Sequence, residues 1–392
     1  MITPNPLAGV ALHGTGALFA ANCYAPQKFI KRWSWETFWI VQAAFCWLIW
    51  PIVGAMLTIP ELGAVMTEAI DKHPDALAYS FLFSLAYGIG GIAFNYSIKY
   101  IGFALTYAIA VGLSGVLGSI IPPLVRGELT EKLNKPGAGW IIGGMAMGTL
   151  GIALCGIAGR LKEHGLAEKE GGKGDFMLVK GLLLSILAGV LSAVYGFAIE
   201  VTAPVIKIAA DHGAEHWQGN VAYLTANTGA FVTSVIYALF LARKNRSIGE
   251  FVNLGKGEEK ASLFANYVLA ILVGTLWYGQ FFFYNLGHVR MGESYAFTSW
   301  TIHMTMLVLL SNVTGVFFRE WKGCSRRTIV FIVMGLTVLM AAVLMLTYGN
   351  YIGSKKDIPE DQKVSWVSPG KDNNIRCLTD DGHLVRGYKA HI

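Results

Sequence analysis

The sequence predicts an all-α polytopic membrane protein whose ten transmembrane helices form two inverted five-helix repeats. Three observations predict this class. Of the 392 residues, 54% are hydrophobic and only 14% are charged, whereas soluble domains carry about 25% charged residues. The chain divides into apolar runs of about 20 residues, the length that an α-helix needs to cross a bilayer. Similar short segments also recur in the same order in the two halves of the chain.

The apolar runs predict ten helices. Their approximate limits are 7–26, 35–58, 77–98, 103–123, 137–159, 178–202, 219–241, 264–286, 294–317 and 327–350. The runs lack the alternation of apolar and polar residues that is typical of barrel strands, and only helices or closed barrels satisfy the backbone in lipid. The first run has no basic segment before it and no clear cleavage site, so we expect a retained helix.

Lysine and arginine concentrate in alternate loops, those after the first, fifth, seventh and ninth helices. These loops contain Lys28, Lys31, Arg32, Arg160, Lys162, Lys169, Lys173, Arg243, Lys244, Arg246, Lys256, Lys260, Arg319, Lys322, Arg326 and Arg327. The loop at 59–76 is acidic. Because basic loops stay on the cytoplasmic side, we expect both termini outside. The net charge of +6 is therefore interpreted as a topology signal and not as a nucleic-acid surface.

The two halves of the chain contain matched segments. Phe19-Ala20 and Ala25-Pro26 match Phe197-Ala198 and Ala203-Pro204, Asn95 and Gly102 match Asn285 and Gly292, and Arg126-Gly127-Glu128 matches Arg319-Glu320. The restricted composition of membrane helices is the alternative explanation, which the common order disfavours. Five helices in each half invert the second half relative to the first, as alternating access around a midplane site requires. The predicted units are repeats at 1–160 and 178–353, a cytoplasmic linker at 161–177 and a polar tail at 354–392.

Several short motifs carry a more specific resemblance. They are Cys23-Tyr24-Ala25-Pro26, Trp33-Ser34-Trp35-Glu36-Thr37, the run from Trp277 to Tyr284, Gly287-His288, Ser299-Trp300, His303-Met304 and Glu320-Trp321. In these motifs the chain resembles the L-rhamnose/proton symporter family over roughly residues 7–350. The five-plus-five plan, with Asn95 leading into helix four, resembles the drug/metabolite transporter superfamily.

This resemblance implies a secondary active transporter for proton-coupled uptake of L-rhamnose across the bacterial inner membrane. Glu200, the polar tail and the loops at 60–76 and 244–261 depart from the family pattern. They leave open a carrier of another deoxysugar or small polyol, sodium coupling, or a sugar-sensing membrane protein without net transport. The expected partners are a small sugar, a proton and membrane lipid.

A sugar site combines hydrogen-bonding side chains with aromatic rings in a mostly apolar cavity. One face of helix eight and the start of helix nine supply such a set at helical spacing, namely Trp277, Gln280, Tyr284, His288, Trp300 and His303. Aromatic residues at this spacing also simply pack bundles. The prediction of a sugar site rests mainly on Gln280 and His303, because polar groups at this depth in the membrane usually face a cavity. The intramembrane amides Asn22, Asn95 and Asn285 are further candidates, as ligands or as interhelical hydrogen-bonding groups.

Proton coupling requires a group that titrates near the working pH. His303 meets this requirement because unperturbed histidine titrates at about 6.5, and Glu200, near the outer end of helix six, is a rival. His13 in helix one is expected to be a buried histidine with satisfied hydrogen bonds. Glu36 is expected to anchor or gate helix two.

Other features of the sequence predict structure or exclude function classes. Pro26 and Pro204 stand at equivalent helix ends, as hinges or plain terminators. The tail is expected to be a weakly ordered extension, with a hairpin signal at Asp381-Gly382. The sequence contains no Walker motif, nucleophile–base set or metal-ligand spacing. It therefore predicts neither an enzyme nor an ATP-driven pump, and no cofactor or bound metal.

Overall fold

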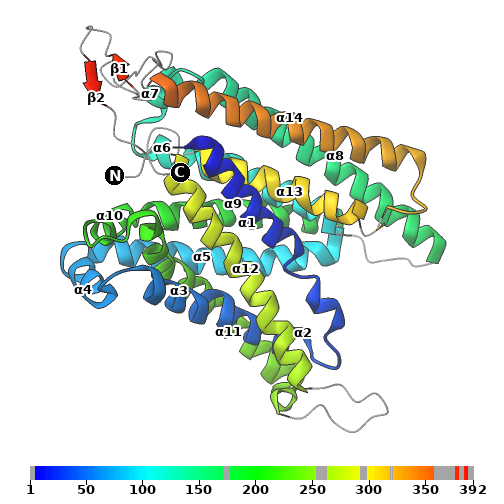
Figure 1. Ribbon diagram of the computed structural model, residues 1–392. Coiled ribbons are helices and arrows are strands. Elements are labelled where there is room, and N and C mark those ends of the chain that lie inside the picture. The colour runs from blue at the N-terminus through cyan, green and yellow to red at the C-terminus, as the bar shows by residue number, and fades with distance from the viewer. Residues whose placement is uncertain are drawn as a thin grey trace.

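The computed structural model describes residues 5–101, 103–170, 177–252, 263–291, 298–317, 319, 321–356, 376–378 and 384–386. The described residues form a bundle of long helices with one short two-stranded ribbon (Figure 1). The α-helices are α1 (Pro6–Asn22), α2 (Trp35–Ala44), α3 (Trp50–Thr58), α4 (Leu62–Lys72), α5 (Pro74–Ile101), α6 (Phe103–Val125), α7 (Leu129–Asn134), α8 (Ala138–Glu170), α9 (Leu178–Glu200), α10 (Ala203–Asp211), α11 (Tyr223–Asn245), α12 (Leu263–Met291), α13 (Ser299–Phe317) and α14 (Arg326–Lys356). Shorter elements are the 3-10 helices η1 (Pro26–Phe29), η3 (Glu215–Ala222) and η4 (Ile248–Phe251), the π-helical turn η2 (Phe45–Ile49), and strands β1 (Arg376–Leu378) and β2 (Leu384–Arg386).

Nine helical segments of the described chain are long and apolar enough to cross a membrane. They correspond to the second through tenth predicted runs, whereas α1 has 17 residues and lies in the same bundle. Large apolar side chains remain exposed on the outer faces of this bundle, for example Leu150 on α8 and Leu344 on α14, which are 51% and 61% exposed. Such side chains favour lipid over water as the surrounding medium.

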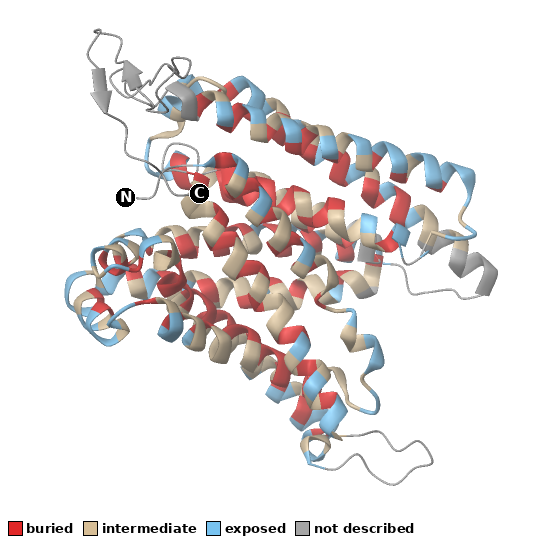
Figure 2. Cartoon of the chain, viewed as in Figure 1, coloured by how far each residue is buried: buried red, intermediate tan, exposed pale blue. Residues whose placement is uncertain are grey.

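Helices from distant parts of the chain lie side by side. α1 packs against α12 and α13, α9 packs against α5 and α6, and α8 packs along α14. Buried residues line the surfaces that face the bundle interior (Figure 2). Glycines permit the close α8–α14 contact: a Cβ atom on Gly151 would lie 2.7 Å from the Cγ of Leu339, and one on Gly335 would lie 2.7 Å from the Sγ of Cys155. Small residues at such contacts let membrane helices approach closely.

Several elements differ from the expectation. The second predicted helix is interrupted by the π-helical turn η2, a type of bulge that occurs often at functional sites. The acidic loop at 59–76 contains the helix α4, and the segment expected as a linker at 161–177 is helical as far as Glu170. β1 and β2 pair antiparallel on either side of the Asp381-Gly382 signal, whose own residues lie outside the described chain, as do Gly102 and Gly292 of the matched segments.

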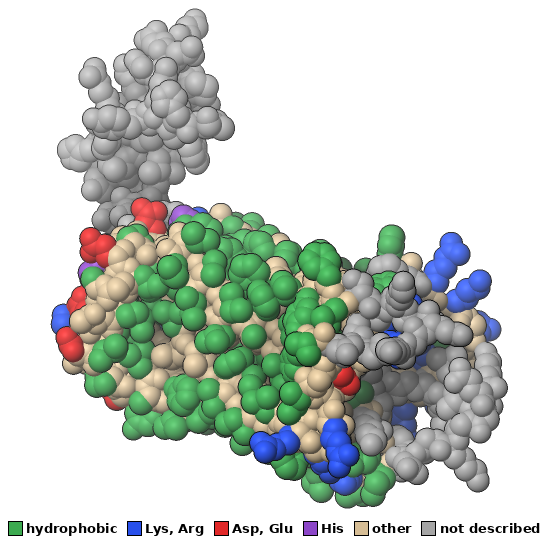
Figure 3. Space-filling view, turned by 90° about the horizontal axis from the view of Figure 1, so that it is seen from below, with side chains coloured by type: hydrophobic (Ala, Val, Ile, Leu, Met, Phe, Trp, Pro, Cys, Tyr) green, Lys and Arg blue, Asp and Glu red, His purple; other side chains and the backbone are tan. Residues whose placement is uncertain are grey.

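Charge is distributed unequally between the two ends of the bundle. Acidic side chains gather at the end formed by α4 and α10, whereas most of the visible Lys and Arg side chains lie at the opposite end (Figure 3). The acidic end carries Glu61, Glu68, Asp71, Asp75 and Asp211. A broad apolar belt separates the two ends, which is the pattern expected of a protein that spans a bilayer.

His212 fastens α4 to the segment that follows α10. Its Nε2 lies 3.0 Å from Oε2 of Glu68, and its Nδ1 lies 3.4 Å from Oε2 of Glu61. The hydrogen bond with Glu68, supported by Glu61, raises the pKa of His212 above its ordinary value. A raised folded-state pKa stabilises the contact below the unfolded pKa of about 6.5, and this stabilisation disappears as the pH rises through the folded-state pKa.

We therefore predict that His212→Gln accelerates amide hydrogen exchange in α4 at pH 5.5 but has little effect at pH 8.5, after correction for intrinsic exchange. Hydrogen-exchange mass spectrometry of both proteins measures this difference. His216→Gln serves as the control because the contacts of His216 are with Trp217 and Glu215 of its own helix η3. An equal acceleration at both pH values would contradict the assigned protonation effect.

Candidate functional site

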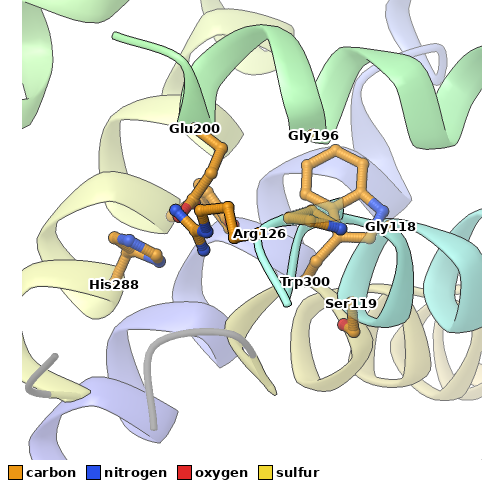
Figure 4. Close-up of a pocket in the computed structure, with 9 residues that line it drawn as sticks. Gly118, Ser119, Arg126, Gly196, Glu200, His288 and Trp300 are labelled. Carbon is orange, nitrogen blue, oxygen red and sulfur yellow. The ribbon is translucent and has the colours of Figure 1, made fainter. Parts of the chain in front are cut away.

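A small pocket lies between α6, α9, α12 and α13 (Figure 4). It is lined by Gly118, Ser119, Pro122, Arg126, Gly196, Glu200, Tyr284, His288 and Trp300. Its free volume is about 20 Å³, room for about one water molecule. Pockets that enclose small organic ligands measure roughly 300–1,000 Å³. The helices around the pocket are therefore in a closed arrangement and must separate before a ligand of sugar size enters.

An ion pair stands at one side of this pocket. Nη1 of Arg126, just beyond the end of α6, lies 2.7 Å from Oε1 of Glu200, the last residue of α9. Nε of Arg126 also lies 3.4 Å from Oε1 of Glu128. Figure 4 shows His288 beside this pair and Trp300 farther along the pocket. The Arg126 and Glu200 side chains are 38% and 29% exposed, so the pair links the pocket to the surface at this end of the bundle.

Three rings line the pocket, those of Tyr284, His288 and Trp300, and the ring of His303 adjoins that of Tyr284. The ring of Tyr284 lies 5.4 Å from Trp300, 5.4 Å from His303 and 5.9 Å from His288, measured between centroids. Tyr284 and His288 are four residues apart on α12 and therefore share a face. Trp300 donates from Nε1 to Oγ of Ser114 at 3.1 Å. The structure thus brings together four of the residues that the sequence predicted for a sugar site.

Trp277 and Gln280 lie farther along the same helix. Trp277 stands two turns before Tyr284, and its ring lies 5.2 Å from Tyr24 and 5.6 Å from Trp47. Gln280 stands between Trp277 and Tyr284 along α12 and is buried. Its backbone carbonyl faces Gly16 on α1. The predicted face of α12 therefore does point inward, but its residues divide between the pocket and a separate aromatic cluster.

The three predicted asparagines donate to backbone carbonyls and do not line the pocket. Nδ2 of Asn22 donates to the carbonyl of Leu18, and Nδ2 of Asn95 donates to that of Gly91, both at 2.9 Å. Nδ2 of Asn285 donates to the carbonyl of Gly219 at 2.5 Å, which ties α12 to η3. These bonds fit the role of interhelical or intrahelical hydrogen-bonding groups.

Glu36 lies at the opposite end of the bundle from the pocket. It is only 4% exposed, and its Oε1 accepts hydrogen bonds from Nδ2 of Asn245 at 2.9 Å and Oγ of Ser247 at 2.8 Å. These bonds attach the start of α2 to the end of α11. Pro26 begins η1 after α1, and Pro204 lies in the first turn of α10 after α9, so both prolines follow the end of a long helix.

Glu36→Ala is predicted to lower the free energy of unfolding by about 3 kcal/mol, because two hydrogen bonds to a buried carboxylate are lost and their donors stay unpaired. Thermal or denaturant unfolding in detergent, compared with the wild type, measures the change. Glu131→Ala is the matched control, since this carboxylate is 72% exposed and pairs with Lys135, the residue that caps its own helix α7. Equal stability of the two variants would contradict the anchoring role of Glu36.

Two features of the site were missed or misjudged at the sequence level. Arg126 was named only as part of a segment matched between the halves and not as a site residue, and this match was the available signal. His13 was expected to have satisfied hydrogen bonds, and this was wrong: within the described chain neither ring nitrogen has a partner. Among the described residues there is no group of three His, Cys, Asp or Glu side chains that could hold a metal ion.

Comparison with known proteins places the chain among membrane carriers. Residues 4–351 match the family described as L-rhamnose-proton symport protein. An L-rhamnose-proton symporter of Cronobacter sakazakii is 33% identical over 344 residues, which cover 87% of this chain and 97% of the relative. Symporters of the same name from Pectobacterium atrosepticum and Citrobacter koseri are 30% and 31% identical, with 88% and 87% of this chain and 98% and 97% of the relatives covered. The chain therefore belongs to the L-rhamnose-proton symport protein family.

Proposed function

We propose that the protein is a secondary active transporter that takes up L-rhamnose together with a proton across the bacterial inner membrane. The pocket between α6, α9, α12 and α13 carries this proposal, because it combines an ion pair, an imidazole and aromatic rings inside an apolar helix bundle. Membership of the family and the names of the relatives support the substrate and the coupling ion.

The chemistry of the pocket suits a deoxysugar. Glu200 accepts hydrogen bonds from sugar hydroxyls, Arg126 donates to them, and His288 can do either, depending on its tautomer. The rings of Trp300 and Tyr284 offer apolar surface to the C–H face and the methyl group of L-rhamnose. In this assignment Trp277 and Gln280 line the route farther along α12, and Asn22, Asn95 and Asn285 hold the surrounding helices.

An inverted repeat of five helices in each half is supported by the packing pattern. The first helix of the first half, α1, packs on α12 and α13, the third and fourth long helices of the second half. Conversely, α9 packs on α5 and α6, the third and fourth long helices of the first half. Exchanging the halves maps one set of contacts onto the other. We therefore propose that α1 also spans the membrane, which brings the number of spanning helices to ten, and we assign the chain to the drug/metabolite transporter superfamily.

The charge distribution supports an orientation with both termini outside. The end that carries most of the visible Lys and Arg side chains is then cytoplasmic, and the pocket, with Arg126 and Glu200, lies toward the outer end. Alternating access requires the helices to open first on this side and then on the other. His303 and Glu200 are the proposed proton-coupling groups, whereas Glu36, Pro26 and Pro204 contribute to gating at the helix ends.

Uptake of labelled L-rhamnose by proteoliposomes tests this function. Accumulation should follow an imposed inward proton gradient and collapse with a protonophore, and an equal sodium gradient should not replace it. Unlabelled deoxysugars and polyols added in excess identify any preferred competitor. Binding of L-rhamnose without accumulation, in vesicles whose protein keeps its folded elution profile, would contradict transport and favour a sensor.

A further inference from the structure

His13 lies at the centre of the bundle, where no solvent reaches its side chain. Its ring centroid is 6.1 Å from that of His303 on α13 and 5.2 Å from that of Tyr284 on α12. Tyr284 also lines the pocket. Three helices therefore converge on two neighbouring imidazoles just behind the pocket wall.

The hydrogen-bonding capacity of these imidazoles is largely unused. Nδ1 and Nε2 of His13 and Nδ1 of His303 have no hydrogen-bond partner within the described chain. A buried nitrogen without a partner destabilises a fold, and an apolar side chain of similar size would fill the same space without this cost. Packing alone therefore does not account for a histidine at position 13.

Glycines make room for both rings. A Cβ atom on Gly287 would lie 3.0 Å from Nδ1 and Cε1 of His13, and one on Gly16 would lie 3.3 Å from Cε1 of His303. α1 thus presents a glycine to the imidazole of α13, and α12 presents one to the imidazole of α1. These two glycines let the three helices approach closely, and the two histidines therefore lie close to each other.

The surroundings limit the pair to at most one positive charge. α12 contributes Tyr284 and His288 as titratable neighbours, and α13 contributes His303. α14, which also packs against α1, contributes the apolar Val343 and Leu346 near Val10. Glu200 interacts electrostatically with Tyr284 and His288 at the pocket. In such surroundings two adjacent imidazoles do not both become cations, because the second charge is repelled by the first.

We infer that His13 and His303 together form one site that carries a single proton, with Tyr284 between the pair and the sugar pocket. Protonation adds one N–H bond and one positive charge to the pair, and release on the other side of the membrane removes both. This inference rests on the proposed proton-coupled transport, and it makes His13 as necessary for coupling as His303.

The test compares two assays in proteoliposomes that contain the full chain. Counterflow exchanges labelled for unlabelled L-rhamnose and needs no net proton movement, whereas accumulation driven by a pH gradient does. For His13→Gln we expect counterflow within about threefold of the wild type and a loss of gradient-driven accumulation of about tenfold or more. His303→Gln should behave alike, and the double variant should be no worse than either single variant, as expected for residues that act as one unit. His73→Gln, altered at the end of α4, is the matched control and should accumulate the sugar normally.

Gradient-driven accumulation by His13→Gln at the wild-type ratio would overturn the inference while leaving the proposed function intact. Failure of the wild type to accumulate L-rhamnose would instead overturn the proposed function. If His13→Gln also loses counterflow, His13→Asn replaces it, and proton uptake by the wild type is measured as well. Calorimetric binding of L-rhamnose in buffers of different ionisation enthalpy reports the number of protons taken up at pH 7.5. One proton for each sugar supports the shared site, and zero or two overturns it.

Discussion

Replacement of Glu200 by glutamine is expected to lower pH-gradient-driven accumulation of L-rhamnose by about tenfold or more. Oε1 of Glu200 lies 2.7 Å from Nη1 of Arg126 at the pocket. Glutamine retains the size and most of the hydrogen-bonding shape of glutamate, but it has no negative charge and does not bind a proton. The substitution therefore leaves the Arg126 guanidinium without its closest counter-ion and removes one of the two proposed proton-coupling groups.

The control for this prediction is Glu128→Gln. Glu128 lies 3.4 Å from Nε of the same arginine but does not line the pocket, so its variant should transport nearly as well as the wild type. Counterflow in Glu200→Gln should persist at a reduced rate, because exchange needs sugar binding without net proton movement. Equal gradient-driven accumulation by Glu200→Gln and the wild type would exclude Glu200 from coupling.

Gly118→Ala is expected to reduce L-rhamnose uptake by about tenfold and to lower the free energy of unfolding by about 1–3 kcal/mol, the usual cost of overpacking. A Cβ atom at this position would lie 2.5 Å from Cδ1 and 2.8 Å from Nε1 of Trp300. The indole ring must therefore shift, and its 3.1 Å hydrogen bond to Oγ of Ser114 must stretch or break. A single methyl group thus displaces the largest aromatic surface in the pocket.

Gly139→Ala is the matched control for this substitution. Position 139 lies in the first turn of α8, and a Cβ atom there would meet no atom of the described residues within 4 Å, so the variant should keep its uptake and gain slightly in helix stability. Initial uptake rates and unfolding midpoints in detergent measure both effects. Uptake by Gly118→Ala at the wild-type rate would show that the position of the Trp300 ring does not matter for transport.

The pattern of local residues was sufficient to predict nine long apolar helices and to place Tyr284 and His288 on one face of α12. Tyr284 and His288 share a face because four residues make about one turn, and the structure brings both to the pocket. The apolar runs predicted the long helices because a span must bury its backbone hydrogen bonds within itself. Breaks within these runs were harder to predict, as the π-helical turn at Phe45–Ile49 and the helix α4 illustrate.

The partners of each polar residue were not predictable in the same way. Asn285 appeared as a candidate ligand, yet its side chain donates to Gly219 from η3. His13 appeared as a satisfied core residue, although within the described chain its ring nitrogens are unpaired beside His303. The helical periodicity of the sequence indicates which residues share a helix face. Which other helix that face contacts depends on residues far apart in the chain.

The sequence by itself determined that the protein is a helical membrane protein, that its two halves share matched segments, and that one face of α12 and the start of α13 carry aromatic and imidazole groups. These features follow from local composition and periodicity. Only the tertiary structure decided that Arg126 meets Glu200 and that His13 meets His303. Both pairs join segments that are distant in sequence, and the geometry of the histidine pair also depends on close contacts at Gly16 and Gly287, which no local pattern specifies.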